Sequence, residues 1–246
     1  MDLVDELYTK INKTIVDVPG KIFVPISGGL DSRVLAGIIS RRRQIDLSYV
    51  HFVVGKDARH VQYSAQIAAK LDIKDYLVIP IFKEEMDDYN RQIADWNLPP
   101  APSFTAYKKL SQFYDLKEYT LYMPHGMEYI TGIHLTPFEL IYPYHDRKIT
   151  DWFLNTWRPL QKKAVDIYKQ HFFKDFLEPT WDDGLINFCL DLPLKYRVNQ
   201  YLYRKMIVKY FPELASIPRE VLNYRIDTNE VIYTINRLIY SLKKVI

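Results

Sequence analysis

Residues 21–32 read KIFVPISGGLDS, and this stretch decides the fold of the chain. It runs from an apolar strand, through two consecutive glycines, into the helix-like segment 33–43. Glycine accepts backbone angles that other residues resist, so we expect the N–H groups of Gly28 and Gly29 to turn towards an anion. Ser27 and Ser32 add hydroxyl donors, and the first turn of the helix adds its positive dipole end. The stretch therefore predicts a loop that binds the phosphates of a nucleotide.

Asp31 lies in the middle of this loop, among the donors expected to bind phosphate. A carboxylate at that position repels a phosphate unless a cation lies between the two groups. Mg²⁺ binds both carboxylate and phosphate oxygens, which reconciles the two charges. The sequence therefore predicts that Mg²⁺ accompanies the nucleotide and that Asp31 is one of its ligands.

The loop resembles the pyrophosphatase loop (PP-loop) of the N-type ATP pyrophosphatases, which cleave ATP to AMP and pyrophosphate. It differs from the G-x-x-x-x-G-K-[ST] loop of kinases and GTPases. The resemblance implies that a substrate oxygen attacks the α-phosphorus of ATP and that a second nucleophile then displaces AMP. It also implies that the loop residues bind ATP and its pyrophosphate, namely Ser27, Gly28, Gly29, Leu30, Asp31 and Ser32. The alternative is a tight strand-to-helix turn that merely contains two glycines.

Apolar and helical patterns alternate after the loop. Residues 47–54 and 76–81 are apolar runs typical of strands, and residues 58–71 between them have helical periodicity. Alternating strands and helices predict an α/β fold, a Rossmann-like parallel sheet flanked by helices as in the adenine nucleotide alpha hydrolases. Ligands of such sheets bind at the carboxyl ends of the strands. We therefore expect Val53 and Val54, at the end of the second strand, to contact the adenine.

The remaining segments complete the predicted fold. Helical patterns are expected at the N-terminus up to Pro19, over 84–98 and over about 105–116, and a fourth strand over 119–123. Beyond residue 150 strand-like alternation largely disappears, and the chain reads mostly as helices interrupted by prolines. Asp227 and Glu230 form a capping-box-like start for the last helix. We therefore predict an α/β core over 1–150 and a helical C-terminal part over 151–246.

A second motif extends the resemblance. Residues 124–132 read PHGMEYITG, which is similar to the SGEGADELFGG segment of asparagine synthetases. Residues 178–186 and 192–205 resemble later segments of the same family, in the same order. The chain is therefore similar to the synthetase domain of asparagine synthetase and β-lactam synthetase. By this resemblance Glu128 is the second Mg²⁺ ligand beside Asp31, Gly126 contacts ATP, and Lys205 or its neighbour Arg204 neutralises phosphate.

The chain also departs from that family. It reaches its loop within thirty residues, so we expect no glutaminase domain, and the nitrogen would come from free ammonia, an amine or a separate amidotransferase subunit. Tyr129 and Ile133 replace a second acid and a second glycine, which places aspartate as the substrate in doubt. Near the C-terminus, where the family carries Arg-x-Lys, this chain has Arg225, Ile226 and Asp227, so the family's lysine is absent. Arg225, or a residue elsewhere, would then stabilise the negative charge that develops at the α-phosphate.

These features favour an ATP-dependent carbon–nitrogen ligase with ATP and Mg²⁺ as cofactors. It would adenylate a carboxylate of a small acyl substrate and form an amide with ammonia or an amine. Two alternatives stay open. One is an RNA-modifying ATP pyrophosphatase that adenylates a tRNA base, and the other is a degenerate nucleotide-binding subunit that regulates a partner.

Composition narrows these choices. The 246 residues carry a net charge of +3 from 33 basic and 30 acidic residues, which is too even to imply nucleic acid. From residue 195 onward, however, the chain has ten basic residues and only four acidic ones. Either solvated helix faces or an anion-binding surface explains this excess of positive charge. Cys189 is the single cysteine and is expected to be a buried thiol, which excludes an intrachain disulfide and favours the cytoplasm. Neither a signal peptide nor a membrane span is predicted.

Three histidines flank the second motif. The spacing of His125, His134 and His145 matches no zinc-binding pattern. His134 follows Gly132 closely, so a role as a substrate contact or general base is open beside a purely structural one.

Overall fold

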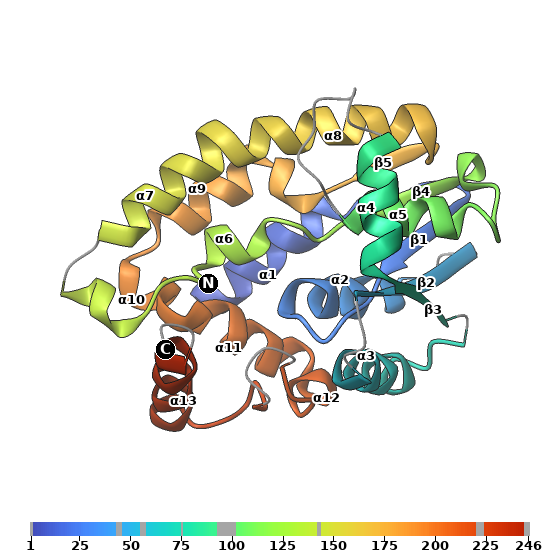
Figure 1. Cartoon of the computed structure of the whole chain (residues 1–246). Helices are drawn as coiled ribbons and strands as arrows, with labels where there is room; N and C mark the ends of the chain where they lie inside the picture. Colours follow the sequence, from blue (N-terminus) through green and yellow to red (C-terminus); the bar gives the residue numbers. More distant parts are fainter. Residues whose placement is uncertain are drawn as a thin grey trace.

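A five-stranded parallel sheet forms the centre of the protein (Figure 1). The computed structural model describes residues 2–42, 46–54, 58–74, 76–92, 102–141, 144–219 and 224–243. The strand order is β3-β2-β1-β4-β5, and every neighbouring pair is parallel. The strands are β1 (Lys21–Pro25), β2 (Asp46–Val54), β3 (Tyr76–Ile81), β4 (Tyr119–Tyr122) and β5 (Asp175–Leu177). The predicted α/β class with a Rossmann-like parallel sheet is confirmed.

Strand β1 occupies the middle of the sheet because it is apolar on both faces. Its Lys21 is in register with Asp46 of β2 on one side and with Tyr119 of β4 on the other. Ile22, Phe23 and Val24 are all fully buried. A parallel strand covered on both faces reads as such a continuous apolar run.

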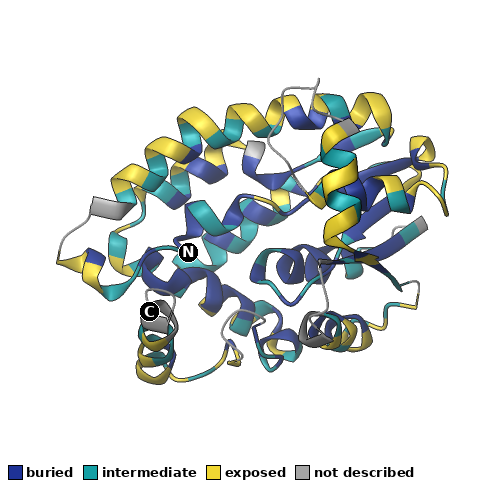
Figure 2. Cartoon of the chain, viewed as in Figure 1, coloured by how far each residue is buried: buried dark blue, intermediate teal, exposed yellow. Residues whose placement is uncertain are grey.

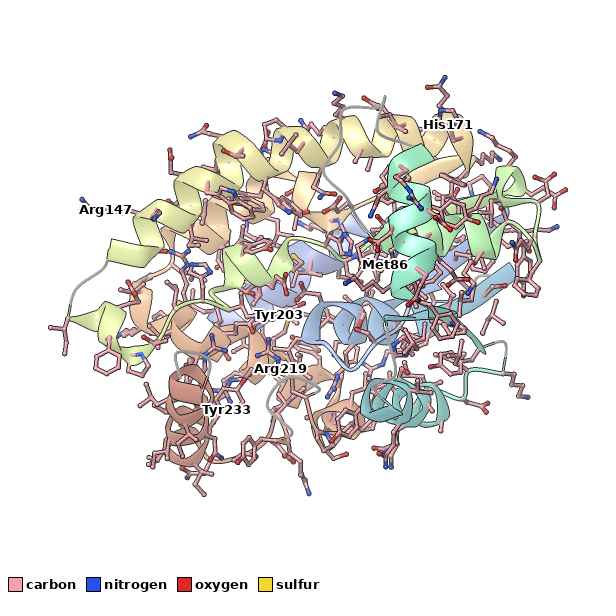
Figure 3. The ribbon with its side chains drawn as sticks, viewed as in Figure 1. Met86, Arg147, His171, Tyr203, Arg219 and Tyr233 are labelled. Carbon is pink, nitrogen blue, oxygen red and sulfur yellow. The ribbon has the colours of Figure 1, made fainter. Side chains whose placement is uncertain are left out.

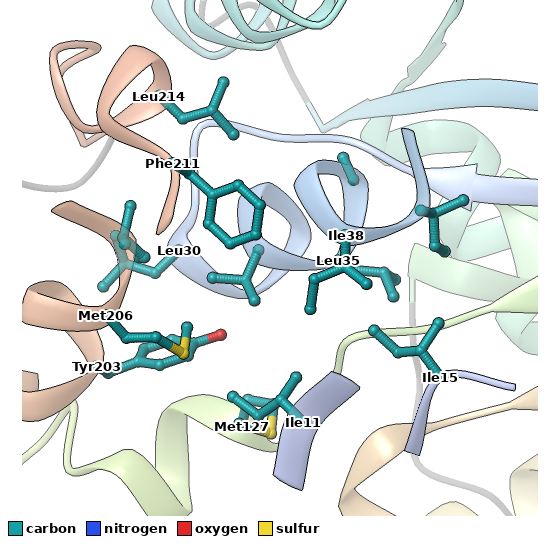
Figure 4. Packing of buried hydrophobic residues seen from close by; sticks show 14 of the residues in the cluster. Ile11, Ile15, Leu30, Leu35, Ile38, Met127, Tyr203, Met206, Phe211 and Leu214 are labelled. Atoms are coloured by element: carbon teal, nitrogen blue, oxygen red, sulfur yellow. The ribbon is translucent and has the colours of Figure 1, made fainter. Parts of the chain in front are cut away.

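Helices cover both faces of the sheet, and successive side chains of β1 point alternately into the hydrophobic core on one face and the core on the other. Ile22 and Val24 join a core with α1 (Leu3–Thr14), α2 (Leu30–Ser40) and α11 (Tyr201–Tyr210), part of which is seen in Figure 4. Phe23 points to the other face and joins a second core with α5 (Pro102–Leu110) and α8 (Arg158–His171). The outward sides of α7 and α8 remain exposed (Figure 2).

The other helices complete these layers. They are α3 (Ala58–Lys70), α4 (Lys83–Gln92), α6 (Met127–Thr131), α7 (Tyr144–Trp152), α9 (Asp183–Asp191), α10 (Leu194–Arg197), α12 (Pro212–Ala215) and α13 (Glu230–Lys243). A π-helical stretch, Phe153–Trp157, joins α7 to α8, and α1 packs against α9 and α11. Among the described helices, none has the length and apolar character needed to cross a bilayer.

The part of the chain beyond residue 150 is mostly helical, as predicted, but it also contributes one strand that the sequence did not indicate. Strand β5 pairs with β4 and extends the sheet. Its three residues, flanked by Lys174 and Glu178, are too few to produce a recognisable alternation. The sheet thus draws one strand from beyond the predicted boundary at residue 150, and that division of the chain stays a prediction.

Two helix boundaries also differ from those predicted. The helix expected over 105–116 begins earlier, at Pro102, and ends at Leu110, and residues 93–98 of the preceding one lie outside the described part of the chain. The last helix is capped by Asn229, whose Oδ1 accepts a hydrogen bond from Val231 N, at 2.9 Å. Asp227 is unavailable as the cap because its carboxylate binds Arg225.

Arg33 of α2 joins the N-terminal and C-terminal parts of the chain. Its side chain is fully buried, and four backbone carbonyl oxygens accept hydrogen bonds from its guanidinium. These acceptors are Gly28 at 2.9 Å, Leu214 at 2.9 Å, Ile217 at 2.7 Å and Pro218 at 3.0 Å. One guanidinium therefore fixes the loop after β1 against the segment that follows α12.

Arg33→Met should lower the free energy of unfolding by about 3–5 kcal/mol, because it leaves four carbonyls without their donor in the core. Arg41→Met is the matched control on the same helix, since Arg41 makes an exposed ion pair with Glu213 at 3.0 Å. Arg41→Met should lower the free energy of unfolding by less than ~1 kcal/mol. Urea unfolding of the three proteins measures both changes, and equal losses would contradict the anchoring role of Arg33.

Candidate nucleotide-binding site

The carboxyl ends of β1, β2 and β4 enclose a pocket of about 300 Å³. Every strand of the sheet points its carboxyl end towards the same edge, so the connections that follow the strands meet there. We call this cavity the loop pocket. It is lined by Pro25, Ile26, Ser27, Gly29, Leu30, Asp31 and Ser32, by Val50, His51 and Phe52, by Met123, Pro124, His125, Glu128 and Ile133, and by Arg219.

The loop after β1 is held by its own hydroxyl groups. Ser32 Oγ accepts a hydrogen bond from Ser27 N, at 3.0 Å, and lies 2.7 Å from Ser27 Oγ. Ser27 Oγ in turn accepts from Gly29 N, at 3.1 Å. Both hydroxyls and the Gly29 N–H thus lie together beside the first turn of α2, where an anion is favoured.

The expected reason for the two glycines is wrong. Gly29 has φ −71° and ψ 167°, which any residue adopts, and Gly28 is not among the glycines with positive φ. Gly28 does not line the loop pocket either, because its carbonyl is bound by Arg33 inside the core. Gly29 is the N-cap residue of α2, and without a side chain it leaves the end of that helix open towards the pocket.

Asp31 and Glu128 come from connections 97 residues apart and meet in the pocket. Asp31 Oδ2 accepts a hydrogen bond from Glu128 N, at 2.9 Å. Both carboxylates line the same cavity, as the resemblance to the asparagine synthetases implies for a pair of Mg²⁺ ligands. Their assignment as ligands stays a prediction.

Gly126 makes this meeting possible. It has φ +88°, in the left-handed region, and it precedes the first residue of α6. A Cβ atom at this position would lie 2.7 Å from the Trp157 ring and 3.1 Å from Thr180 Oγ1. Gly126 therefore shapes the turn that carries Glu128, and it lies outside the lining of the loop pocket.

The electrostatics of the pair call for a cation. Burial and the negative charge of Glu128 raise the pKa of Asp31 well above its ordinary value, while the Glu128 N–H and the charge of Arg219 oppose the rise. The Tyr203 hydroxyl interacts with the Asp31 carboxylate and also opposes the rise, but Asp31 Oδ1 is buried and makes no well-formed hydrogen bond in the described part of the chain. A divalent cation fits these two carboxylates, because it would neutralise both and use the orphaned oxygen. Larger groups of His, Cys, Asp and Glu suited to a metal are absent from the described residues.

Arg219 supplies the positive charge of the pocket, and sequence reasoning missed it as a site residue. Its side chain is only 3% exposed and lines the loop pocket. It donates a hydrogen bond to Tyr233 Oη, at 3.1 Å, and lies between Tyr203 and Tyr233 in Figure 3. In the sequence Arg219 was one of ten basic residues of the C-terminal part, with no motif to single it out.

Two predicted cations lie elsewhere. Arg225 is more than half exposed and binds both oxygens of Asp227, at 2.9 and 2.6 Å. Lys205 is largely exposed on α11, with Nζ 3.8 Å from a Glu230 oxygen. Its neighbour Arg204 is buried, stacks on the Tyr233 ring and pairs with Glu230. Roles for Arg225 and Lys205 in phosphate binding therefore stay predictions that the geometry does not favour.

Of the predicted adenine contacts, Val53 is buried but lies outside the pocket lining. Phe52 lines the pocket instead, together with Val50 and His51 of the same strand. The side chain of Val54 lies outside the described part of the chain. Phe52 was one residue away from the predicted contact.

A second cavity adjoins the loop pocket. It has a volume of about 290 Å³ and shares Phe52, Met123 and His125 with the loop pocket. Aromatic side chains such as Tyr107 and Tyr168 dominate its wall, and among the described residues no Asp, Glu, Lys or Arg lines it. A charged amino acid would find no partner there, whereas an uncharged flat group is well suited to it.

The histidines and the cysteine named in the sequence analysis differ in their positions relative to the two cavities. His125 lines both cavities, His134 lines neither, and the side chain of His145 lies outside the described part. Cys189 is buried as predicted, and burial raises the pKa of its thiol to about 12. The thiol is therefore no nucleophile at neutral pH.

Comparison with known proteins gave structural matches only. No protein-family model matches the chain, and no curated protein matches it. The U34-tRNA thiolase NcsA from Methanococcus maripaludis, solved with its [4Fe-4S] cluster, is 14% identical, with a TM-score of 0.42 over 94% of this chain and 87% of that one. The NH3-dependent NAD synthetase from Campylobacter jejuni is 16% identical, with a TM-score of 0.37 over 81% of this chain and 94% of that one. At such low similarity the activity has to be argued from the pocket itself.

Gly126→Ala should destabilise the protein by about 2–4 kcal/mol, because it combines a left-handed φ with a clash against Trp157. Gly20→Ala is the matched control, since Gly20 has φ +99° but would place its Cβ in open space. That change should cost about 1 kcal/mol from the backbone alone. The midpoints of urea unfolding give the comparison, and equal losses would show that packing around Gly126 is unimportant.

Proposed function

We propose that this protein is an ATP pyrophosphatase of the PP-loop type that forms AMP and pyrophosphate. One observation carries the proposal. The hydroxyls of the loop, the Asp31 and Glu128 carboxylates and the Arg219 guanidinium converge in one pocket at the carboxyl edge of a parallel sheet. Hydroxyl and N–H donors, a carboxylate pair and a cation are what a nucleotide with Mg²⁺ requires.

Each group has a place in the proposed binding mode. Ser27, Ser32 and the N-terminus of α2 bind the β- and γ-phosphates, which leave as pyrophosphate. Asp31 and Glu128 would hold Mg²⁺, which when bound supplies neutralisation of the pyrophosphate charge. Arg219 faces the same pocket and stabilises the charge that develops on the α-phosphate. Arg219 thus takes the role that the sequence left open between Arg225 and another residue.

The finer proposal concerns the reaction. An oxygen of the substrate carboxylate attacks the α-phosphorus, and the bond to the pyrophosphate oxygen breaks. The resulting acyl-adenylate is attacked by ammonia or an amine, which forms the amide, loses a proton and releases AMP. The cavity beside the loop pocket has no charged side chain among its described lining residues, which supports a flat and uncharged substrate body rather than aspartate.

The pairing of the C-terminal cations supports a small-molecule substrate over RNA. Five of the ten basic residues after residue 194 bind acids of this chain, and Arg219 faces the pocket. The five are Arg197, Arg204, Lys205, Lys209 and Arg225. Cations engaged in this way are poor candidates for a phosphate-binding surface, which needs free lysines and arginines.

The first test follows the α-phosphate of ATP. With Mg²⁺, labelled ATP and a pool of small carboxylates and ammonia, the protein should form AMP and pyrophosphate. Asp31→Asn should reduce this rate at least ~100-fold without lowering the free energy of unfolding, because the amide oxygen still accepts from Glu128 N. ADP as the product would overturn the proposed function, and AMP formed only with tRNA would replace the acyl substrate with RNA.

The second test separates the two candidate arginines. Arg219→Met should lower the rate of AMP formation by about 10²–10³-fold, because it removes the buried cation of the pocket. Arg225→Met should leave the rate within about twofold, since Arg225 is exposed and bound to Asp227. Single-turnover rates at saturating ATP measure both variants. The reverse order would restore Arg225 as the residue that stabilises the transition state.

A further inference from the structure

Glu178 is a buried carboxyl group at the same edge of the sheet, and the proposed reaction does not use it. It directly follows β5 and is 8% exposed, and Thr180 two residues later is fully buried. Thr180 Oγ1 lies 2.8 Å from Glu178 Oε1 and 2.8 Å from the backbone oxygen of His125. The three groups form one buried cluster beside the turn between β4 and α6.

The number of protons decides how this cluster is bonded. A threonine hydroxyl carries one proton and can donate to one acceptor only. The His125 carbonyl can only accept, so Thr180 must donate to it if that bond is to form. Glu178 then forms the other bond only when it is protonated and donates to Thr180 Oγ1. Both distances are satisfied together by a neutral Glu178.

The turn held by Thr180 carries Glu128. His125 precedes Gly126, whose carbonyl accepts from Tyr129 N, at 3.1 Å, and so opens α6. Glu128 lies in this first turn, and its N–H bonds Asp31. A chain of contacts therefore leads from Glu178 through Thr180 to the carboxylate pair of the loop pocket.

We propose that neutral Glu178 is a positioning residue: by donating to Thr180 it holds the turn between β4 and α6 so that Glu128 lies against Asp31. Ionised Glu178 can only accept, so it competes with His125 for the single Thr180 proton and releases the turn. The consequence for nucleotide binding rests on the proposed function.

The surroundings of Glu178 keep it neutral at physiological pH. Burial raises the pKa of Glu178 to about 8, while the hydrogen bond with Thr180 and the positive charge of Arg158 on α8 oppose the rise. Arg158 is itself engaged by Asp183, at 2.7 Å. From α5 the hydroxyl of Tyr107 faces the same region, and burial raises the pKa of Tyr107 well above its ordinary value. Glu178 is therefore neutral below about pH 8 and ionised above it.

The first experiment measures binding of a non-hydrolysable ATP analogue with Mg²⁺ by calorimetry at pH 7 and pH 9. The affinity of the wild-type protein should fall about tenfold between these values, as one ionisation near pH 8 requires. Glu178→Gln, whose amide donates permanently, should match the wild type at pH 7 and keep that affinity at pH 9. Thr180→Val should bind weakly at both values, and Thr180→Ser should behave like the wild type.

The second experiment needs no nucleotide. Trp157 packs against Gly126, so its fluorescence reports the turn, and Trp157→Phe identifies its share of the signal. The nucleotide-free protein should show a transition near pH 8 that Glu178→Gln abolishes. A wild-type signal without this transition, or tight binding independent of pH, would overturn the role of Glu178. Failure to bind the analogue at any pH, with the transition present, would overturn the proposed function and with it the effect of Glu178 on affinity.

Discussion

The buried guanidinium of Arg33 is the interaction on which the rest of the site depends. It binds the Gly28 carbonyl on one side and the carbonyls of Leu214, Ile217 and Pro218 on the other. A buried charge is tolerated only where its hydrogen-bonding capacity is used, so both segments are fixed relative to α2. Gly28 belongs to the loop after β1, and Pro218 precedes Arg219. One side chain therefore fixes the loop after β1 relative to the segment that carries Arg219.

The site itself is a consequence of the parallel sheet. Because all five strands point the same way, the connections after β1, β4 and β5 meet at one edge. Each connection carries a carboxyl group there, Asp31, Glu128 and Glu178. Their environments differ, since Asp31 and Glu128 face the pocket together while Glu178 is enclosed with Thr180. Carboxyl groups in different environments can perform different tasks, and we propose cation binding for the first two and positioning for the third.

The charges around the pocket are unbalanced in a way that suits an anionic ligand with a cation. Burial and the charges of Arg219 and Arg204 lower the pKa of Arg237 to about 10, while burial and Glu128 raise that of Asp31. Groups of like charge have thus gathered in two places, guanidiniums towards α13 and carboxylates towards α6. Such an arrangement costs free energy, and a nucleotide with its metal ion would offset part of that cost on binding.

The sequence by itself determined the class of fold and the principal loop, because both are encoded locally. A continuous apolar run, two glycines and a helix start predict a strand, a turn and a helix wherever they occur, and the alternation that follows predicts a parallel sheet. Asp31 was predicted from this loop and Glu128 from the resemblance of its segment to the asparagine synthetases, and the structure places both in one pocket. Only the tertiary structure showed that Arg219 faces the pocket and that the Gly28 carbonyl binds Arg33. It also showed that residues 175–177 complete the sheet. Arg219, Arg33 and Glu178 owe their roles to contacts with residues distant in sequence or buried by the fold, and no local pattern of residue types records such contacts.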